Sequence, residues 1–235
     1  MSYELNLPSP SEIHPEAILA DLATRWAGAS RVLQQHGLDF CCRGQQSLLA
    51  ACAQKGLDPI VVVAELRAST EPVPRDESWE TRPTEALVTH VLDRYHAGHR
   101  AELPRLLQMA RRVEAVHGEK ADCPRGLADH LQYVAGELES HMQKEEQVLF
   151  PMLLAGASLS VRGPVMVMEA EHLEHGRNLE RLRQLAHDFV PGEGACGTWR
   201  ALYLGLAEFE REVMEHIHLE NHVLFPRAAS AGSHG

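Results

Sequence analysis

Histidine and glutamate recur at one fixed spacing in two copies of a motif. Residues 141–151 read HMQKEEQVLFP and residues 216–226 read HIHLENHVLFP, and the two strings agree at His, Glu, Val, Leu, Phe and Pro. In each copy the histidine precedes the glutamate by four residues, so on a helix the two side chains lie one above the other on the same face. An imidazole and a carboxylate placed in this way can bind one cation together.

Two further histidines extend this repeat. The motif copies are offset by 75 residues, from 141 to 216, and His172 follows His96 at the similar offset of 76. Counting about 100° per residue along a helix places all of these side chains, and also Val148, on apolar faces. The pattern predicts one helical hairpin used twice. Its core-facing polar residues are His96, His141, Glu145, His172, His216 and Glu220.

Four imidazoles and two carboxylates form a donor set for a hard or borderline metal. Without thiolates, such a set suits iron, manganese or zinc better than calcium or a soft ion. The near two-fold repeat favours two metals bridged by the carboxylates, and solvent-derived or exogenous ligands must complete their coordination. As an alternative, a single core-facing histidine is more often a hydrogen-bonded core residue, and the duplication could serve packing. Two motifs with a matching histidine on each remaining helix favour the metal site.

The remaining polar residues near these positions are given lesser roles. Glu169 stands three residues before His172, a spacing used by di-iron carboxylate proteins, but it points about 85° from the centre of the apolar stripe and is rejected as a ligand. The others fall into two sets: His99, His130 and His175 are expected beside the ligands or in the core, and Glu171, His218 and His222 at the surface.

The elements that must position these residues are long helices. After residue 83 the apolar pattern predicts four helices and no strand, which indicates an all-α, up-down-up-down four-helix bundle. A first unit of short helices precedes it, with helical spacing from Ile18 to Leu33 that stops at His36–Gly37. The predicted domains are a small helical domain with a Cys-Cys pair over 1–70, a linker over 71–83, and the bundle over 84–228, with helices near 84–117, 125–152, 163–189 and 197–225.

Composition narrows the possible partners and location. The chain has 235 residues and a net charge of -11, which argues against nucleic acid or an anionic membrane as the main partner. The N-terminal sequence is not of secretory type, and no apolar run is long enough to cross a bilayer, so a cytoplasmic location is expected. The 15 histidines are several times ordinary usage and favour metal binding.

The cysteines do not suggest a disulfide framework. There are five of them, and Cys41 and Cys42 are adjacent, so a bond between these two would strain the peptide that joins them. Lying beside Arg43 and just before a helix, the pair could have depressed pKa values and act as thiolates toward a metal, nitric oxide or an oxidant. An equally weighted alternative is two small residues in a turn.

Five strings of the sequence resemble the hemerythrin-like di-iron proteins for repair of iron centres, also called iron-sulfur cluster repair proteins. They are HGLDFCCRGQQSL, RYHAGHRAELPRL, ESHMQKEEQVLFPM, MEAEH and EHIHLENHVLFPRA. Arg43 departs from this pattern, since many members have Gly there. The resemblance implies two iron ions per chain, bridged by Glu145 and Glu220 and by an oxo or hydroxo group. The ligands that it implies are His96, His141, Glu145, His172, His216 and Glu220.

The resemblance also implies a function. It is the repair of iron-sulfur clusters damaged by nitrosative or oxidative stress, by iron donation or by handling of nitric oxide, with Cys41 and Cys42 as a thiol relay. The expected partners are damaged iron-sulfur proteins and the small ligands NO and O2, with no nucleic acid and no membrane; a homodimer is left open. Two alternatives stay open as well: a di-iron nitric oxide reductase, and a non-enzymatic O2 or NO sensor or carrier. Whether the chain is an enzyme is therefore undecided.

Overall fold

The structure is a computed structural model that describes residues 7, 9–156 and 160–230. The start of the predicted N-terminal domain, residues 1–6 and 8, lies outside the described residues. The chain splits into two compact units. One comprises residues 88–213, and the other comprises residues 1–87 together with residues 214–235, so the boundary falls inside the helix α10. The fold is all-α, as predicted, with an N-terminal helical domain and a four-helix bundle.

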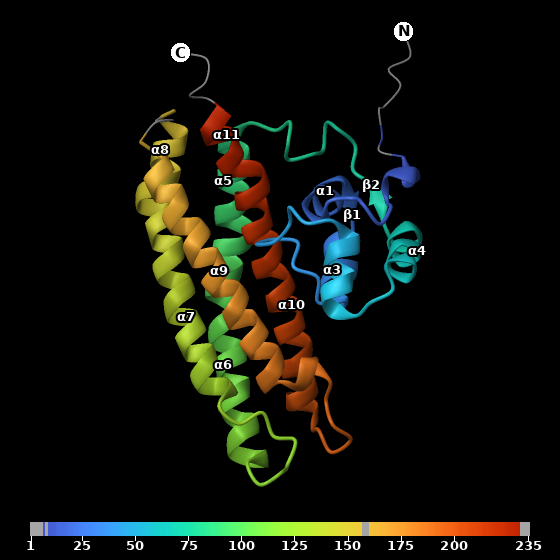
Figure 1. Ribbon diagram of the computed structural model, residues 1–235. Helices are drawn as coiled ribbons and strands as arrows, with labels where there is room; N and C mark the ends of the chain where they lie inside the picture. Colours follow the sequence, from blue (N-terminus) through green and yellow to red (C-terminus); the bar gives the residue numbers. More distant parts are fainter. Residues whose placement is uncertain (1–6, 8, 157–159, 231–235) are drawn as a thin grey trace. The chain divides into compact units, whose positions relative to one another are not determined.

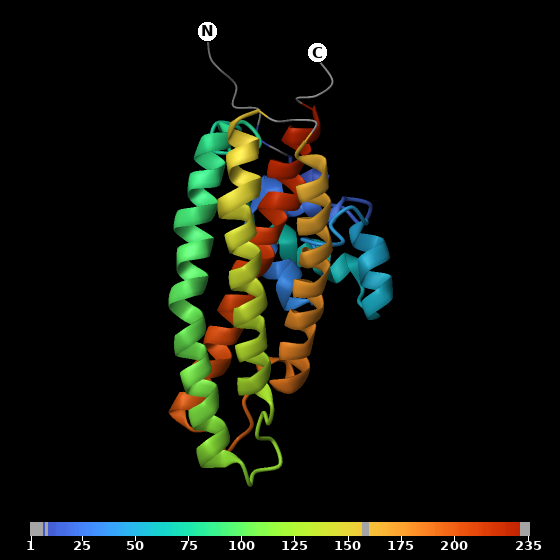
Figure 2. The ribbon, with the colours of Figure 1, turned by 90° about the vertical axis from the view of Figure 1, so that its left-hand side faces the viewer.

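Long helices that run alongside one another form the unit of residues 88–213. Helix α6 packs against α7, and α7 packs against α9. Figures 1 and 2 show these three helices and the first part of α10 following one another in alternating directions. The elements are η2 (Val91–His96), α6 (Ala97–His117), α7 (Leu127–Lys144), η3 (Glu145–Leu149), α8 (Phe150–Leu154), α9 (Arg162–Leu185), η4 (His187–Phe189) and α10 (Gly197–Leu219), the last continuing past the boundary.

Three of the four long helices contain a π-helical segment. These segments are η2, which ends at His96, η3, which begins at Glu145, and η5 (Glu220–Leu224). Such segments occur often at functional sites, because one extra residue per turn rotates everything that follows. The rotation explains an error of the sequence analysis. Val148, predicted to be in the core, is 48% exposed, and its neighbour Leu149 is buried instead.

Short helices form the N-terminal part of the other unit. They surround an apolar core that includes Leu33, Phe40 and Leu48. The elements of this unit are η1 (Pro10–Glu12), α1 (Leu19–Arg25), β1 (Trp26–Ala27), α2 (Ala29–Gln35), α3 (Leu48–Lys55), α4 (Pro59–Ser69), β2 (Glu71–Pro72), η5 and α11 (Phe225–Ser230), and α5 (Thr84–His90) begins in it.

One break in this unit differs from the sequence expectation. The apolar spacing from Ile18 to Leu33 predicts one helix, but the structure interrupts it after Arg25. Strand β1 pairs antiparallel with β2, and Gly28 then takes a left-handed conformation with φ of 88° before α2 begins. The partner residues lie some 45 positions away in the sequence, so a local pattern could not indicate the pairing.

Capping residues mark both ends of α3 and the start of α4. The Ser47 hydroxyl accepts a hydrogen bond from the Ala50 N–H and begins α3, and Gly56 ends it with φ of 67°. Asp58 caps α4, with Pro59 in the first turn, where no backbone donor is required. Among the helices of the described ranges, none is both long enough and apolar enough to span a membrane.

Candidate metal centre

Four of the six predicted ligands lie together in the unit of residues 88–213. The side chains of His96, His141, Glu145 and His172 are at most 1% exposed. Glu145 offers its two oxygens to two different histidines: Oε2 lies 3.3 Å from His96 Nε2, and Oε1 lies 3.2 Å from His141 Nε2. His172 Nε2 lies 3.2 Å from His141 Nε2. A single carboxylate thus stands between two imidazole nitrogens, one on either side.

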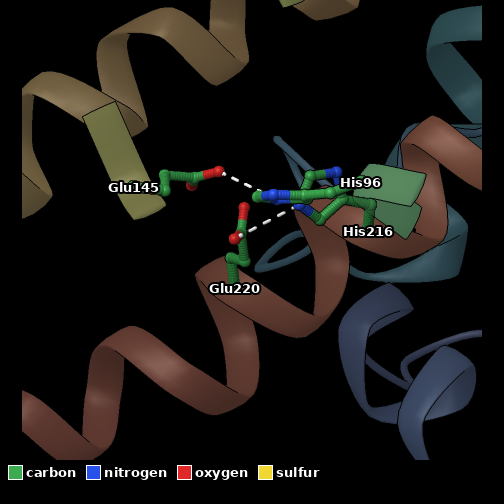
Figure 3. Close-up of side chains that lie close together, drawn as sticks. All are labelled: His96, Glu145, His216 and Glu220. Carbon is green, nitrogen blue, oxygen red and sulfur yellow. Dashed lines mark ion pairs between the residues drawn. The ribbon is translucent and has the colours of Figure 1, made fainter. Parts of the chain in front are cut away.

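The other two predicted ligands form the second copy of the motif. Glu220 Oε1 lies 3.3 Å from His216 Nε2, and both side chains are buried. Figure 3 shows the ion pair of His216 with Glu220 and that of His96 with Glu145. Within the unit of residues 88–213, the potential ligand atoms of His141, Glu145 and His172 lie within 4.8 Å of one another, and so do those of His96 and Glu145. Glu145 belongs to both of these groups.

The donor spacing fits metal ligation. Two ligand atoms at about 2.1 Å from one metal are about 3.0–3.4 Å apart at octahedral or tetrahedral angles, and the separations above lie in this range. Burying two carboxylates is costly unless cationic charge compensates them. The residues present therefore suit divalent or trivalent cations with imidazole and carboxylate ligands.

A carboxylate holds the far ring nitrogen of His96. Its Nδ1–H donates to Glu146 Oε1 over 2.8 Å, and Arg100 donates to the same oxygen over 2.7 Å. The hydrogen bonds and charges of Arg100 and His96 outweigh burial and lower the pKa of Glu146. Because an ionised carboxylate can only accept, His96 donates from Nδ1 to Glu146, and its Nε2, 3.3 Å from Glu145 Oε2, is the nitrogen that remains to bind a cation.

His141 is oriented in the same way. Its Nδ1–H donates to Glu171 Oε2 over 2.9 Å, and Lys144 donates to the other oxygen of Glu171 over 2.5 Å. Chiefly through the hydrogen bond from His141, the pKa of Glu171 falls to about 2. Each group of candidate ligands thus contains one imidazole that is backed by a carboxylate.

The structure also places the histidines and glutamates that were expected outside the ligand set. Glu171 was expected at the surface, but its side chain is only 27% exposed and binds His141. His218 was expected there too and is 4% exposed, while His222 is half-buried. His99 and His175 are buried, and the ring of His175 stands edge-on to that of His141 at 4.8 Å. Neither Glu146 nor Glu171 could be assigned from spacing, because their partners lie on other helices.

Comparison with known proteins agrees with this geometry. A model of the hemerythrin HHE cation binding domain matches residues 87–228, and the ScdA_N domain of unknown function matches residues 15–70. The chain belongs to the hemerythrin-like iron-sulfur cluster repair family. It is 50% identical to the iron-sulfur cluster repair protein YtfE of Yersinia pseudotuberculosis serotype IB and 49% identical to that of Yersinia pestis strain Pestoides F. Each match covers 89% of this chain and 95% of the relative.

Membership of this family gives the metal its identity. A hemerythrin domain implies iron, which accepts the imidazole and carboxylate donors found here. The resemblance noted in the sequence is confirmed.

The twin cysteines of this repair-family chain lie in the loop between α2 and α3. Cys41 is buried, and its Sγ lies 3.5 Å from Cys42 Sγ and 3.3 Å from Asp39 Oδ1. The pKa of Cys41 is not depressed, contrary to the sequence expectation. The neighbouring Cys42 thiol, burial and the Asp39 carboxylate all raise it well above its usual range.

The segment that carries Glu220 also holds the cysteine loop. The carbonyl oxygen of Cys41 accepts hydrogen bonds from Asn221 Nδ2 and from His222 Nε2, each over 3.0 Å. The His218 ring is hydrogen-bonded to the Thr24 hydroxyl at 2.9 Å, and burial lowers the pKa of His218 to about 3. One face of this segment therefore carries candidate metal ligands, and another face holds the backbone carbonyl of Cys41.

Proposed function

We propose that this chain is a di-iron protein that repairs iron-sulfur clusters damaged by nitrosative or oxidative stress. Its iron ligands would be His96, His141, Glu145, His172, His216 and Glu220. The relatives named above as iron-sulfur cluster repair proteins support this assignment, since they match the chain over both of its domains. Damaged iron-sulfur proteins would be its clients.

One observation carries the di-iron assignment. Glu145 directs one oxygen to His96 and the other to His141, and these two histidines belong to different ligand groups. A carboxylate divided in this way can bridge two metals. In the repeat Glu220 pairs with His216 as Glu145 pairs with His141, so Glu220 would be the second bridge. Four imidazoles and two carboxylates do not saturate two irons, so positions stay open for a small ligand.

The protein's own residues would keep this set in place. Glu146 and Glu171 fix the protonated Nδ1 of His96 and His141, which leaves both Nε2 atoms available as ligands. When bound, the iron pair supplies ferrous iron for a damaged cluster or open positions for nitric oxide. The buried surroundings exclude water from all six side chains.

Cys41 and Cys42 would act as a relay for iron or nitric oxide between the chain and its client. Cys42 is partly exposed, and the backbone carbonyl of Cys41 is held by residues 221 and 222, next to Glu220. All five cysteines, each within the described part of the chain, are thiols rather than disulfides, which supports our proposal that the protein acts in the reducing cytoplasm.

An anaerobic reactivation assay tests the repair function. A dehydratase whose [4Fe–4S] cluster has been damaged by nitric oxide is incubated with iron-loaded protein, with metal-free protein, or with the same amount of a ferrous salt. We expect recovery of dehydratase activity with the loaded protein beyond that with the salt. Equal recovery with the salt would refute iron donation, and stoichiometric nitrous oxide from the di-ferrous protein would favour the reductase instead.

A further inference from the structure

A second cluster of metal-binding residue types lies apart from the histidine and glutamate ligands. Asp39, Cys41 and Cys42 each offer one ligand atom, and these atoms lie within 4.8 Å of one another. The Cys41 Sγ stands 3.5 Å from Cys42 Sγ and 3.3 Å from Asp39 Oδ1. Two thiols and a carboxylate gathered on four consecutive residues form a compact set of donors.

We propose that Asp39, Cys41 and Cys42 bind a thiophilic divalent cation of the zinc, cadmium or ferrous iron class. With metal–sulfur bonds of about 2.3 Å and metal–oxygen bonds of about 2.1 Å, tetrahedral ligands are about 3.8 Å apart for two sulfurs and about 3.6 Å apart for sulfur and oxygen. The observed separations are shorter by only a few tenths of an ångström. Rotation of the side chains alone can open the set around a cation.

The electrostatics of the cluster favour a cation. The Asp39 carboxylate and the Cys42 thiol both lie within 3.5 Å of Cys41 Sγ, so ionising the thiols without a cation would place negative charges side by side. A dication reverses this repulsion: two thiols lose their protons, two metal–sulfur bonds and one metal–oxygen bond form, and two protons go to solvent. The net charge of the three side chains and the cation is then -1, in place of the -3 that they would carry if fully ionised without metal.

The backbone around the cluster is already fixed. Asp39 Oδ1 accepts the Cys42 N–H over 2.8 Å, and the Cys41 carbonyl is held by Asn221 and His222. At Gly44 an added Cβ would lie 2.3 Å from the carbonyl oxygen of Phe40, so only glycine fits there. A binding loop that is ordered in advance loses little conformational entropy when the ion binds.

Three donors leave one tetrahedral position open. Water can fill it, and so can a thiolate of a client protein, which is the arrangement that a transfer site needs. The role in transfer rests on the proposed function, and its cargo would be a divalent cation bound by thiolates. Cation binding itself does not require that the chain repair clusters, so the two ideas can fail separately.

Cobalt titration tests the proposal on the full chain with its iron loaded. Co²⁺ is added anaerobically, and thiolate-to-cobalt charge-transfer absorption is recorded while iron content is measured in parallel. We expect one cobalt per chain with thiolate absorption and no loss of iron. The absorption should vanish in Cys41→Ser and Cys42→Ser, and Asp39→Asn should weaken binding about 10- to 100-fold. Cys196→Ser, at a cysteine outside the cluster, is the matched control.

A measurement on the unmodified protein tests the site even if the variants fold poorly. Cd²⁺ should slow the alkylation of Cys41 and Cys42, read by mass spectrometry, and leave that of Cys196 unchanged. Asn221→Ala with His222→Ala should weaken cobalt binding about 10-fold, whereas Ser30→Ala, which removes the hydrogen bond to Glu215, should not. Absence of thiolate absorption together with absence of Cd²⁺ protection would overturn the site. Failed cluster reactivation alongside intact cobalt binding would count against the repair function instead.

Discussion

Glu171 accepts a hydrogen bond from Nδ1 of His141, although the two residues lie on different helices, α9 and α7. The contact would make His141 a better ligand, because the carboxylate raises the electron density of the ring and fixes its tautomer. We expect Glu171→Gln to lower iron affinity about 10- to 100-fold, measured by competition with a chelator at neutral pH. Glu174→Gln, one turn along α9, is the control. Equal affinity in both variants would contradict a role for this contact.

The depressed pKa of Glu171 sets the pH range of that contribution. In the unfolded chain a glutamate titrates near about 4.3, and in the folded protein the pKa is about 2. Its stabilisation is therefore fully present above pH 4.3 and is lost as the pH falls toward 2. Iron loss that occurs between pH 7 and 5 therefore does not arise from titration of Glu171 itself. Because Glu171→Gln lowers iron affinity, the midpoint of that loss should lie at a higher pH in this variant than in wild type. An unchanged midpoint would contradict the role given to this contact.

Glu145 should make stability depend on metal. Its carboxylate is fully buried between His96 and His141, so cations would compensate its charge in the loaded protein. A metal present at about 100 times its Kd stabilises the fold by about 2.7 kcal/mol. Chelation should lower the Tm of wild type, and Glu145→Gln should shrink the difference between loaded and metal-free protein. Glu137→Gln, at an exposed site on α7, should keep the full difference. An undiminished difference in Glu145→Gln would exclude it as a ligand.

Particular residues show which features of the structure the sequence predicted and which it missed. The proposed ligand set followed from the 75-residue repeat and the helical period, because both can be recognised along the chain without its fold. Val148 was misplaced because the period of 3.6 residues fails where η3 widens the helix. Glu146 and Glu171 were missed because their partners lie on other helices. The break at Trp26 depends on pairing with Pro72, which is again a long-range contact.

The raised pKa of Cys41 predicts low reactivity. A buried thiol beside Cys42 and Asp39 forms its thiolate only at a pH well above that of an ordinary cysteine, near about 8.5. Its alkylation by iodoacetamide at pH 8 should therefore be slower than that of the same cysteine in unfolded protein. Asp39→Asn should speed the reaction, because it removes a neighbouring negative charge. Because the folded pKa is raised, the contribution of this thiol to stability is full below pH 8.5 and is lost as the pH rises. A rate at Cys41 equal to that in the unfolded chain would contradict the shift.

Arg183 of α9 and Glu210 of α10 form an ion pair in which the glutamate is buried and the arginine is partly exposed. Two guanidinium nitrogens donate to the two carboxylate oxygens over 2.6 and 2.5 Å, and the Glu210 side chain is 4% exposed. Arg183→Met would leave a buried carboxylate without its cation, so we expect a loss of about 3–5 kcal/mol in the free energy of unfolding, measured in urea. Arg181→Met, at an exposed position of α9, should change it by less than about 0.5 kcal/mol. Adding Glu210→Leu to Arg183→Met should restore most of the loss, because the double substitution leaves no buried charge. If the double variant is as unstable as Arg183→Met alone, packing of the arginine stem rather than charge holds the two helices together.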